Sequence, residues 1–379
     1  MQILQNKIHF NTASPMLYAN KVAVIEKTEK LTKKLKKHLE NVGENKQIKF
    51  NSHEIVDIPD IHGDFVHLML TLKSHSLLTD DLNLKKKYKY VFLGDFYNRG
   101  KDSDVLDNWV NKQIELGREI YRLIGNHELL FLLRDENNNP LVKIRAHDKD
   151  GNSIRIPAND IEKDTLDNFE ITEEVLKNIA NGSFIAAFSN HDKKYLTPIL
   201  RAHSFVTKND FDLLELESHD VDNFANKLNE TLIELGKDSY ERFLDYKQKE
   251  KYNWREIIEP FTRKPFFNIF KKDLNNKFVS YINRVTGIVE VQNGKNVTKK
   301  IATCFSDELP EGIYQIVGHT NIADFNLPKT SPIHPIIIRN NSQTSHVQFT
   351  DVGIGFYYKN KSFKRPEVII NGDFSKVIT

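Results

Sequence analysis

The sequence contains a single cysteine, Cys304, among its 379 residues. One thiol cannot form an intramolecular disulfide, so we do not expect folding to need an oxidising compartment. The surrounding segment, 301–305, is mostly apolar, which predicts a buried and unreactive side chain. No cysteine stands in a glycine-rich loop with an arginine, so a cysteine nucleophile is not expected.

Long hydrophobic runs are also missing. No stretch approaches the roughly 18 apolar residues of a membrane-spanning helix, so we expect no membrane insertion. The first 20 residues lack the continuous apolar core of a signal peptide. These absences predict a cytoplasmic protein, while the Lys- and Asn-rich composition also fits a bacterial effector that enters a host cell by an uncleaved signal.

The chain carries little net charge. The formal value of +2 is too small to predict nucleic acid or a membrane surface as the main partner. Lysine runs at 33–37 and 85–87 are typical of solvated helix faces and turns. We therefore look for function in short motifs and not in bulk charge.

Residues 1–50 are expected to form an N-terminal helical extension. Leucines recur at four-residue spacing in 24–42 (Leu31, Leu35 and Leu39), which predicts an amphipathic helix that ends near Gly43. Residues 51–379 are expected to form one domain with two insertions. The first insertion, near 135–180, is polar, and the second, near 207–275, is charged and helical.

Strand and helix patterns alternate between residues 53 and 134. This alternation indicates βαβ units and therefore an α/β fold with helices covering a sheet. The predicted strands are 53–59, 89–94 and 119–125, and the predicted helices are 65–78, 103–116 and 128–134. Later strands are expected at 199–206, 313–320 and 345–355, with a hairpin in 277–303 that turns at Asn293-Gly294.

Three short polar motifs follow the three early strands. They are DIHGD at 60–64, GDFYNRG at 94–100 and GNHE at 125–128. Asp95 lies 33 residues after His62, and Asn126 lies 31 residues after Asp95, so each step is one βαβ unit. Ligands collect at the carboxyl ends of strands in open α/β sheets, which predicts that the motifs meet at one edge.

The residue types in these motifs suit a pair of divalent cations. Asp60 and His62 are two residues apart on an extended segment, so both side chains can face one ion. Asp95 has two oxygens and can bridge two ions. Further along the chain, Asn126, His203 and His319 can supply an amide oxygen and imidazole nitrogens to a second ion.

The ordered motifs and the two later histidines resemble the calcineurin-like metallophosphoesterase superfamily. The GNHE form, together with the Arg-Gly that ends the second motif, resembles its phosphoprotein phosphatase branch, which covers Ser/Thr protein phosphatases and relatives such as diadenosine tetraphosphate hydrolases. The resemblance implies a β-sandwich of two mixed sheets flanked by helices, with residues 207–275 as a helical cap beside the site.

The resemblance also implies a role for each motif residue. Asp60 and His62 would hold the first metal, Asp95 would bridge, and the second metal would be held by Asn126, His203 and His319. A metal-bridging hydroxide would attack the phosphorus directly. Arg99 would bind phosphate oxygens, and His127 would protonate the leaving oxygen.

Three positions depart from the family pattern. Pro59 replaces the usual glycine before the first Asp, and Asn321 replaces a histidine found in many members outside the phosphatase branch. Asn98 stands where the branch has an aspartate that orients the catalytic histidine. Asn98 could still hold His127 by a hydrogen bond, but without charge, which predicts a preference for good leaving groups such as phenols.

Some of these roles have more than one candidate residue. His191 is the alternative to His203 as a ligand of the second metal, and His334 and His346 are the alternatives to His319. A second phosphate-binding arginine is expected, with Arg201 and Arg284 as the candidates. Glu128 is expected to cap or support the helix of the third motif rather than perform chemistry, and Asp351, in a late strand, is expected to be structural.

The sequence therefore predicts a dimetal-dependent phosphomonoester hydrolase. Manganese is the expected metal, with iron or zinc as alternatives, and a phosphoprotein or phosphopeptide is the expected substrate, carrying phosphoserine, phosphothreonine or phosphotyrosine. No nucleic acid is expected as a partner, and no oligomeric state is predicted. The alternatives are a diadenosine polyphosphate or other nucleotide hydrolase and an inactive binding module that kept the fold.

Overall fold

The computed structural model describes most of the predicted core of the chain. The described residues are 15–40, 55–132, 134, 137, 143–147, 153–157, 169–191, 197–217, 220–264, 289–291, 295–297, 309–319, 336–339 and 344–351.

The first sheet is parallel throughout the described residues and contains the three strands that precede the motifs. Its order is β1-β2-β3-β6, and its strands are β1 (Ile55–Ile58), β2 (Lys89–Phe92), β3 (Glu119–Leu123) and β6 (Phe184–Ile185). Parallel strands require a crossover connection, and helices supply it between β1 and β2 and between β2 and β3.

The second sheet is mixed and has seven described strands. β11 is parallel to β8 and β13, and the other pairings are antiparallel. In spatial order the strands are β10 (Lys295–Val297), β9 (Val289–Val291), β12 (Ile336–Arg339), β13 (His346–Phe349), β11 (Tyr314–Val317), β8 (Pro198–Ala202) and β7 (Ala187–His191).

The two sheets share a small apolar core. It is formed by side chains from both sheets: Val91, Leu93, Leu123, Ile199 and Ile316. Side chains alternate along a strand, so Tyr90 and Phe92 belong instead to the larger core that the helices cover. The molecule is therefore a two-sheet sandwich with helical outer layers.

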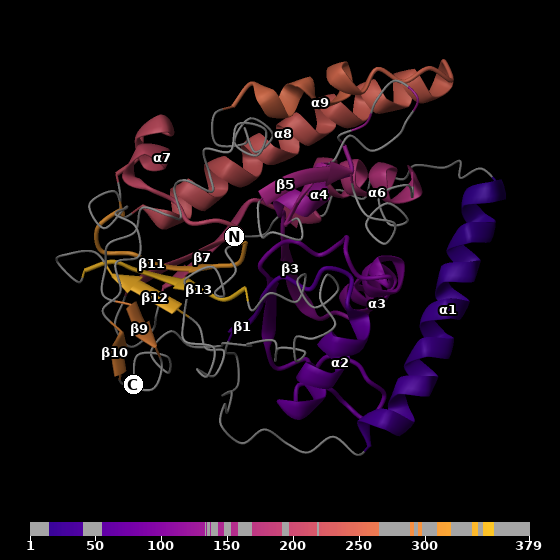
Figure 1. The fold of residues 1–379 in the computed structure, drawn as a ribbon, viewed down its shortest axis with the longest axis horizontal. Coiled ribbons are helices and arrows are strands. Elements are labelled where there is room, and N and C mark those ends of the chain that lie inside the picture. Colours follow the sequence, from indigo (N-terminus) through magenta and orange to yellow (C-terminus); the bar gives the residue numbers. More distant parts are fainter. Residues whose placement is uncertain are drawn as a thin grey trace.

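Eight described helices accompany the sheets (Figure 1). They are α1 (Pro15–Leu39), α2 (Phe65–Ser74), α3 (Ser103–Glu115), α4 (Asn126–Leu130), α6 (Phe169–Ala180), α7 (Lys208–Leu213), α8 (Val221–Gln248) and α9 (Trp254–Thr262). A separate antiparallel hairpin pairs β4 (Lys143–His147) with β5 (Ser153–Pro157). None of these helices is both long enough and apolar enough to cross a membrane.

Helix α1 packs against α3, as Figure 1 shows. The predicted stripe is partly realised, because Leu35 and Leu39 are buried in the main core. Lys27 adds a surface ion pair to Asp104 of α3 at 2.8 Å. The structure thus joins this helix to the layer that covers the first sheet.

Helix α8 is the longest helix described and contacts α6, α9 and β7. Its buried residues recur at three- and four-residue spacing, among them Phe224, Leu228, Leu232 and Leu235. Asp220 caps its first turn by accepting a hydrogen bond from Asn223 N at 3.3 Å. The predicted helical region after residue 207 is therefore confirmed as helices α7, α8 and α9.

The α/β class predicted from the sequence is confirmed, with differences in detail. The first sheet is parallel rather than mixed. Helix α2 ends at Ser74 and not at residue 78, because the chain then turns and Leu78 pairs with Leu84. Strand β12 was not predicted, since a short apolar run becomes a strand only through its pairing with β13 and β9.

The predicted third helix, 128–134, is also different. Helix α4 begins two residues earlier and ends at Leu130. The predicted hairpin of 277–303 is confirmed in part, because β9 and β10 pair antiparallel. The turn at 293–294, Gly43, Arg284, Cys304 and His334 lie outside the described residues.

Candidate metal centre

The motif residues converge at the carboxyl ends of strands from both sheets. The three motifs follow β1, β2 and β3, which are parallel neighbours. His203 directly follows β8, and His319 lies two residues after β11, its parallel neighbour. Parallel pairing aligns the residues within each sheet, and the packing of the two sheets brings together residues up to 259 positions apart, since His319 N donates to Asp60 Oδ2 at 2.9 Å.

A first group of possible ligands contains His62, Asp95 and His127, all buried. The Nε2 atoms of both histidines lie 3.8 Å from the same carboxylate oxygen, Asp95 Oδ2. One ligand atom from each residue lies within 4.8 Å of the others, which is close enough for a single ion to contact all three.

A second group contains Asp95, His203 and His319. His203 Nε2 lies 3.2 Å from Asp95 Oδ1, the other oxygen of the shared carboxylate. Asn126 Oδ1 lies 3.0 Å from His203 Nε2 and 2.8 Å from His319 Nδ1. Asp95 therefore presents one oxygen to each group, which is the arrangement that two neighbouring cations need.

The hydrogen bonding of His203 favours a cation in this second group. Its Nδ1 lies 2.8 Å from the carbonyl oxygen of Leu93, which can only accept, so Nδ1 carries the proton. In the neutral ring Nε2 then has a lone pair, and it faces the oxygens of Asp95 and Asn126. Three acceptors at this spacing are compatible when a positive ion lies among them.

Asp60 makes a second argument for a cation. Its Oδ1 is fully buried and has no hydrogen-bond partner among the described residues. Burial, followed by repulsion from Asp351 and Asp95, raises the pKa of Asp60 well above its usual value. A bound cation would supply both the missing contact and the missing positive charge.

Three histidines of the site, His127, His203 and His319, are held neutral. Burial lowers the pKa of His203 to about 4, and burial together with His203 and Arg99 lowers that of His319 to about 3. Burial, then the charge of Arg99, lowers the pKa of His127 well below its usual value. Neutral imidazole is the form that binds metal ions, so the site is prepared for them.

The backbone is strained at the site. Positive φ angles occur at His62 (50°), Asp95 (47°), Asn98 (73°), Arg99 (64°) and His319 (59°). Such conformations cost on the order of 1–3 kcal/mol each and cluster at functional sites. These residues account for five of the nine described non-glycine positions with positive φ, so the strain is concentrated where the motifs meet.

Glu128 joins the second and third motifs. Its buried carboxylate accepts hydrogen bonds from the backbone N atoms of Gly125 at 2.7 Å, Asp95 at 3.1 Å, Phe96 at 2.7 Å and Tyr97 at 3.0 Å. Burial and then Asp95 raise its pKa to about 8, against the lowering effect of these hydrogen bonds. The predicted supporting role is thus visible as a direct link between two loops.

Arg99 lies at the first group, where its Nη1 is 3.1 Å from His62 Nε2. The guanidinium is therefore beside the possible metal ligands, as a phosphate-binding arginine would be.

Asn98 does not hold His127 in this structure. Its Oδ1 accepts a hydrogen bond from Arg99 N at 2.6 Å. His127 Nδ1 is buried and has no hydrogen-bond partner among the described residues. The hydrogen bond considered from the sequence is thus absent, because the turn of the loop directs the Asn98 side chain to its own backbone.

Arg201 is not a phosphate ligand of this site, although the sequence made it a candidate. It is buried between the sheets, where Nε and Nη2 bind the carboxylate of Asp57 on β1 and Nη1 binds Asn190. The strand position decides this outcome, because alternate residues of β8 point into the sandwich. A pattern of alternating residues in 199–206 could have revealed it.

The other competing residues lie apart from the two groups. His191 forms an exposed ion pair with Asp222 at 2.9 Å, and the ring of His346 stacks on Tyr314 with centroids 4.3 Å apart. Asp351 is buried and raises the pKa of Asp60. The structure therefore brings His203 and His319 to the site, and not His191 or His346.

Comparisons with known proteins give only distant likenesses. No protein-family model and no curated protein matches the chain. A cold-active protein tyrosine phosphatase solved at 1.1 Å has 14% identity and a TM-score of 0.38, over 83% of this chain and 74% of that one. The cold-active protein-tyrosine phosphatase of a psychrophilic Shewanella species has 15% identity and a TM-score of 0.36, over 83% and 75%.

A provisionally named diadenosine tetraphosphatase has 13% identity and a TM-score of 0.29, over 82% of this chain and 87% of that one. At these TM-scores the likenesses decide neither a family nor an activity. The function is therefore inferred from the residues of the site.

Proposed function

We propose that the chain is a dimetal-dependent phosphomonoester hydrolase that acts on phosphoproteins. The observation that carries the proposal is the position of Asp95, whose two carboxylate oxygens face two separate groups of histidines. The order of the motifs resembles that of metallophosphoesterases, which supports phosphomonoester hydrolysis as the reaction. Two divalent cations, manganese first and iron or zinc as alternatives, are the proposed cofactors.

The proposed ligands combine the two groups of residues with the motif pattern. His62 and Asp95 of the first group would hold one ion, with Asp60 added from the resemblance, while His203, His319 and Asn126 would hold the second ion with the other oxygen of Asp95. When bound, such a pair of ions lowers the pKa of a water molecule and neutralises the charge on phosphate oxygens. His127 also lies within reach of the first site, at 3.8 Å from Asp95 Oδ2.

Two residues would act on the ester itself. Arg99 presents a planar set of donors beside His62 and would orient the phosphate oxygens. His127 would deliver a proton to the leaving oxygen. Because the Asn98 side chain bonds to Arg99 N, it does not hold the His127 ring, and we propose a preference for phenolic leaving groups such as phosphotyrosine.

The test is a substrate panel with metal-depleted protein. We expect hydrolysis of p-nitrophenyl phosphate and of phosphopeptides only after manganese, iron or zinc is restored. Asp95→Asn should lower the rate by at least about 100-fold, because the bridging charge is lost. Asp222→Asn is the matched control, since Asp222 is exposed and pairs only with Ser189 and His191.

Other outcomes would identify the alternatives. Hydrolysis of diadenosine tetraphosphate in preference to every phosphopeptide would replace the protein substrate by a nucleotide. Failure to bind metal and to hydrolyse any ester would point to a binding module that kept the fold.

A further inference from the structure

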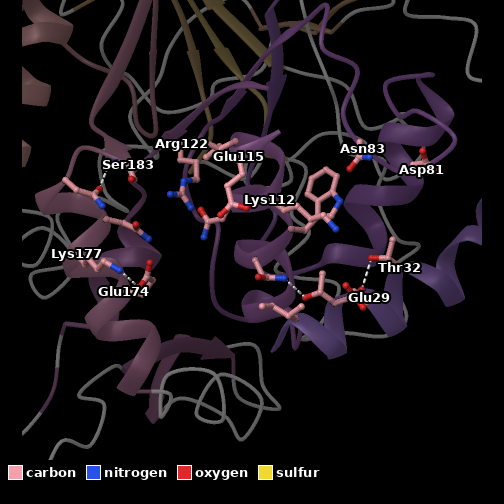
Figure 2. A pocket seen from close by; sticks show the side chains of 18 of the residues that line it. Glu29, Thr32, Asp81, Asn83, Lys112, Glu115, Arg122, Glu174, Lys177 and Ser183 are labelled. Atoms are coloured by element: carbon pink, nitrogen blue, oxygen red, sulfur yellow. Dashed lines mark hydrogen bonds and ion pairs between the residues drawn. The ribbon is translucent and has the colours of Figure 1, made fainter. Parts of the chain in front are cut away.

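A pocket of about 900 Å³ lies between α1, α3 and α6 and shares no residue with the candidate metal centre (Figure 2). Its volume falls in the range of roughly 300–1,000 Å³ that is usual for small-molecule sites. Thr28 and Glu29 of α1, Lys112 and Glu115 of α3, and Asn178 of α6 are among its lining residues. Three helices that are distant in sequence thus line one open pocket.

Two buried donors in this lining have no acceptor. Arg122 Nε and Asn178 Nδ2 are fully buried atoms without a hydrogen-bond partner among the described residues. The side chains are almost completely covered, at 2% and 4% exposure, so bulk water does not satisfy them. Unpaired buried donors are rare in proteins, and here a ligand with acceptor oxygens would complete them.

The charges that line the pocket are balanced in sign. Lys33 and Lys112 are matched by Glu29 and Glu115, and none of these four has an ion-pair partner among the described residues. A simple anion would meet as much repulsion as attraction from this rim. A molecule that carries both a positive and a negative group matches it better.

Apolar side chains form part of the same lining. Trp109 is buried, while Ile25 and Ile114 are among the few exposed large hydrophobic residues, at 38% and 40% exposure. They would cover a small apolar group on a ligand.

We propose that this pocket binds a small zwitterion with a carboxylate, an ammonium group and an apolar side chain, namely a free amino acid or a dipeptide. The carboxylate accepts from Arg122 Nε and Asn178 Nδ2, and the ammonium group lies at Glu29 or Glu115.

Calorimetric titration of the full chain with leucine and with leucyl-leucine tests this proposal. Leucinamide lacks the carboxylate, and 4-methylpentanoate lacks the ammonium group. We expect both to bind at least about tenfold more weakly than leucine. Equal binding of the three compounds, or no binding of leucine and leucyl-leucine at millimolar concentration, would overturn the proposal.

Variants place the ligand in this pocket. Asn178→Asp replaces the unpaired donor by a negative acceptor and should weaken leucine binding by at least about tenfold. Arg122 is a poor choice, because its Nη1 also binds Asp107 at 2.9 Å, and Asp107 accepts from the Tyr97 hydroxyl at 2.8 Å in the second motif. Lys112→Ala serves as a second variant if Asn178→Asp fails to fold, because it removes a positive charge from the lining and leaves an excess of negative charge that should weaken binding of the ligand's carboxylate.

The matched control is Lys249→Ala, whose side chain pairs with Asp245 at an exposed end of α8. It should bind leucine as the native chain does. Unchanged affinity in folded Asn178→Asp or, where that variant is unfolded, in Lys112→Ala would overturn the assignment to this pocket. So would binding of inorganic phosphate or ATP without any binding of an amino acid.

Discussion

The side chain of Glu128 holds the backbone of Asp95, because Glu128 Oε2 accepts a hydrogen bond from Asp95 N at 3.1 Å. The same carboxylate also accepts a hydrogen bond from Gly125 N, the first residue of the third motif. The loop that carries the shared carboxylate and the loop that carries Asn126 and His127 are thus fixed to one buried side chain. Precise placement of metal ligands depends on such supporting contacts.

Glu128→Gln should disturb this link without changing side-chain size. The amide puts an NH₂ donor against backbone N–H groups, so we expect a loss of about 1–3 kcal/mol in the free energy of unfolding. Metal binding should weaken by about tenfold or more. Urea unfolding and metal titration measure the two effects, with Glu119→Gln at the surface as control. If both quantities stay at native values, Glu128 does not position Asp95.

Gly318→Ala should act directly on Asp60. A Cβ atom at Gly318 would collide with Asp60 Oδ1, whereas at Gly312 it would meet nothing within 4 Å. We expect at least about tenfold weaker metal binding for Gly318→Ala. Gly312→Ala, at a φ of +75°, should cost only about 1 kcal/mol of stability through backbone strain. Metal titration of the two variants side by side tests this prediction. Equal metal affinities would show that Asp60 is not a metal ligand.

Arg201→Met should destabilise the sandwich and leave substrate affinity intact. It leaves Asp57 buried and unpaired, which typically costs about 3–5 kcal/mol. The double variant Arg201→Met with Asp57→Leu removes both charges and should lose less free energy of unfolding than Arg201→Met alone. Denaturant unfolding measures the stabilities, and KM for p-nitrophenyl phosphate serves as the second readout. A raised KM together with native stability would show that Arg201 binds the phosphate group of the substrate after all.

Asn98→Asp tests the consequence of the unusual second motif. A carboxylate at this position could stabilise protonated His127, so alkyl phosphates should gain more rate than aryl phosphates. We expect the aryl-to-alkyl ratio of kcat/KM to fall by about tenfold, within the usual range for general acid catalysis. The same ratio in both proteins would show that Asn98 does not limit proton donation by His127.

Removal of metal should lower the stability of the folded chain. A ligand that binds only the native state adds about 2.7 kcal/mol at a concentration 100 times its dissociation constant. Thermal unfolding before and after manganese is added should therefore show a clear rise in Tm for the native chain. Asp95→Asn should show little or no rise, and an equal rise would contradict its bridging position.

The sequence by itself was enough to predict the motif residues of the candidate centre. Asp60, His62, Asp95 and Asn126 could be named because each follows an apolar strand at regular spacing, and parallel strands end at one edge. Local patterns also sufficed for the α/β class. These features depend on neighbours in the chain, so periodicity and turn residues reveal them.

Only the tertiary structure decided which distant residues join that centre and which do not. His203 reaches Asp95 and Arg201 turns into the sandwich, although they are two residues apart on one strand segment. The parallel pairing of β8 with β11 places His319 beside His203, and the packing of the two sheets brings both to Asn126. Such outcomes depend on sheet register and on which face a side chain occupies, and pairing between distant segments sets both.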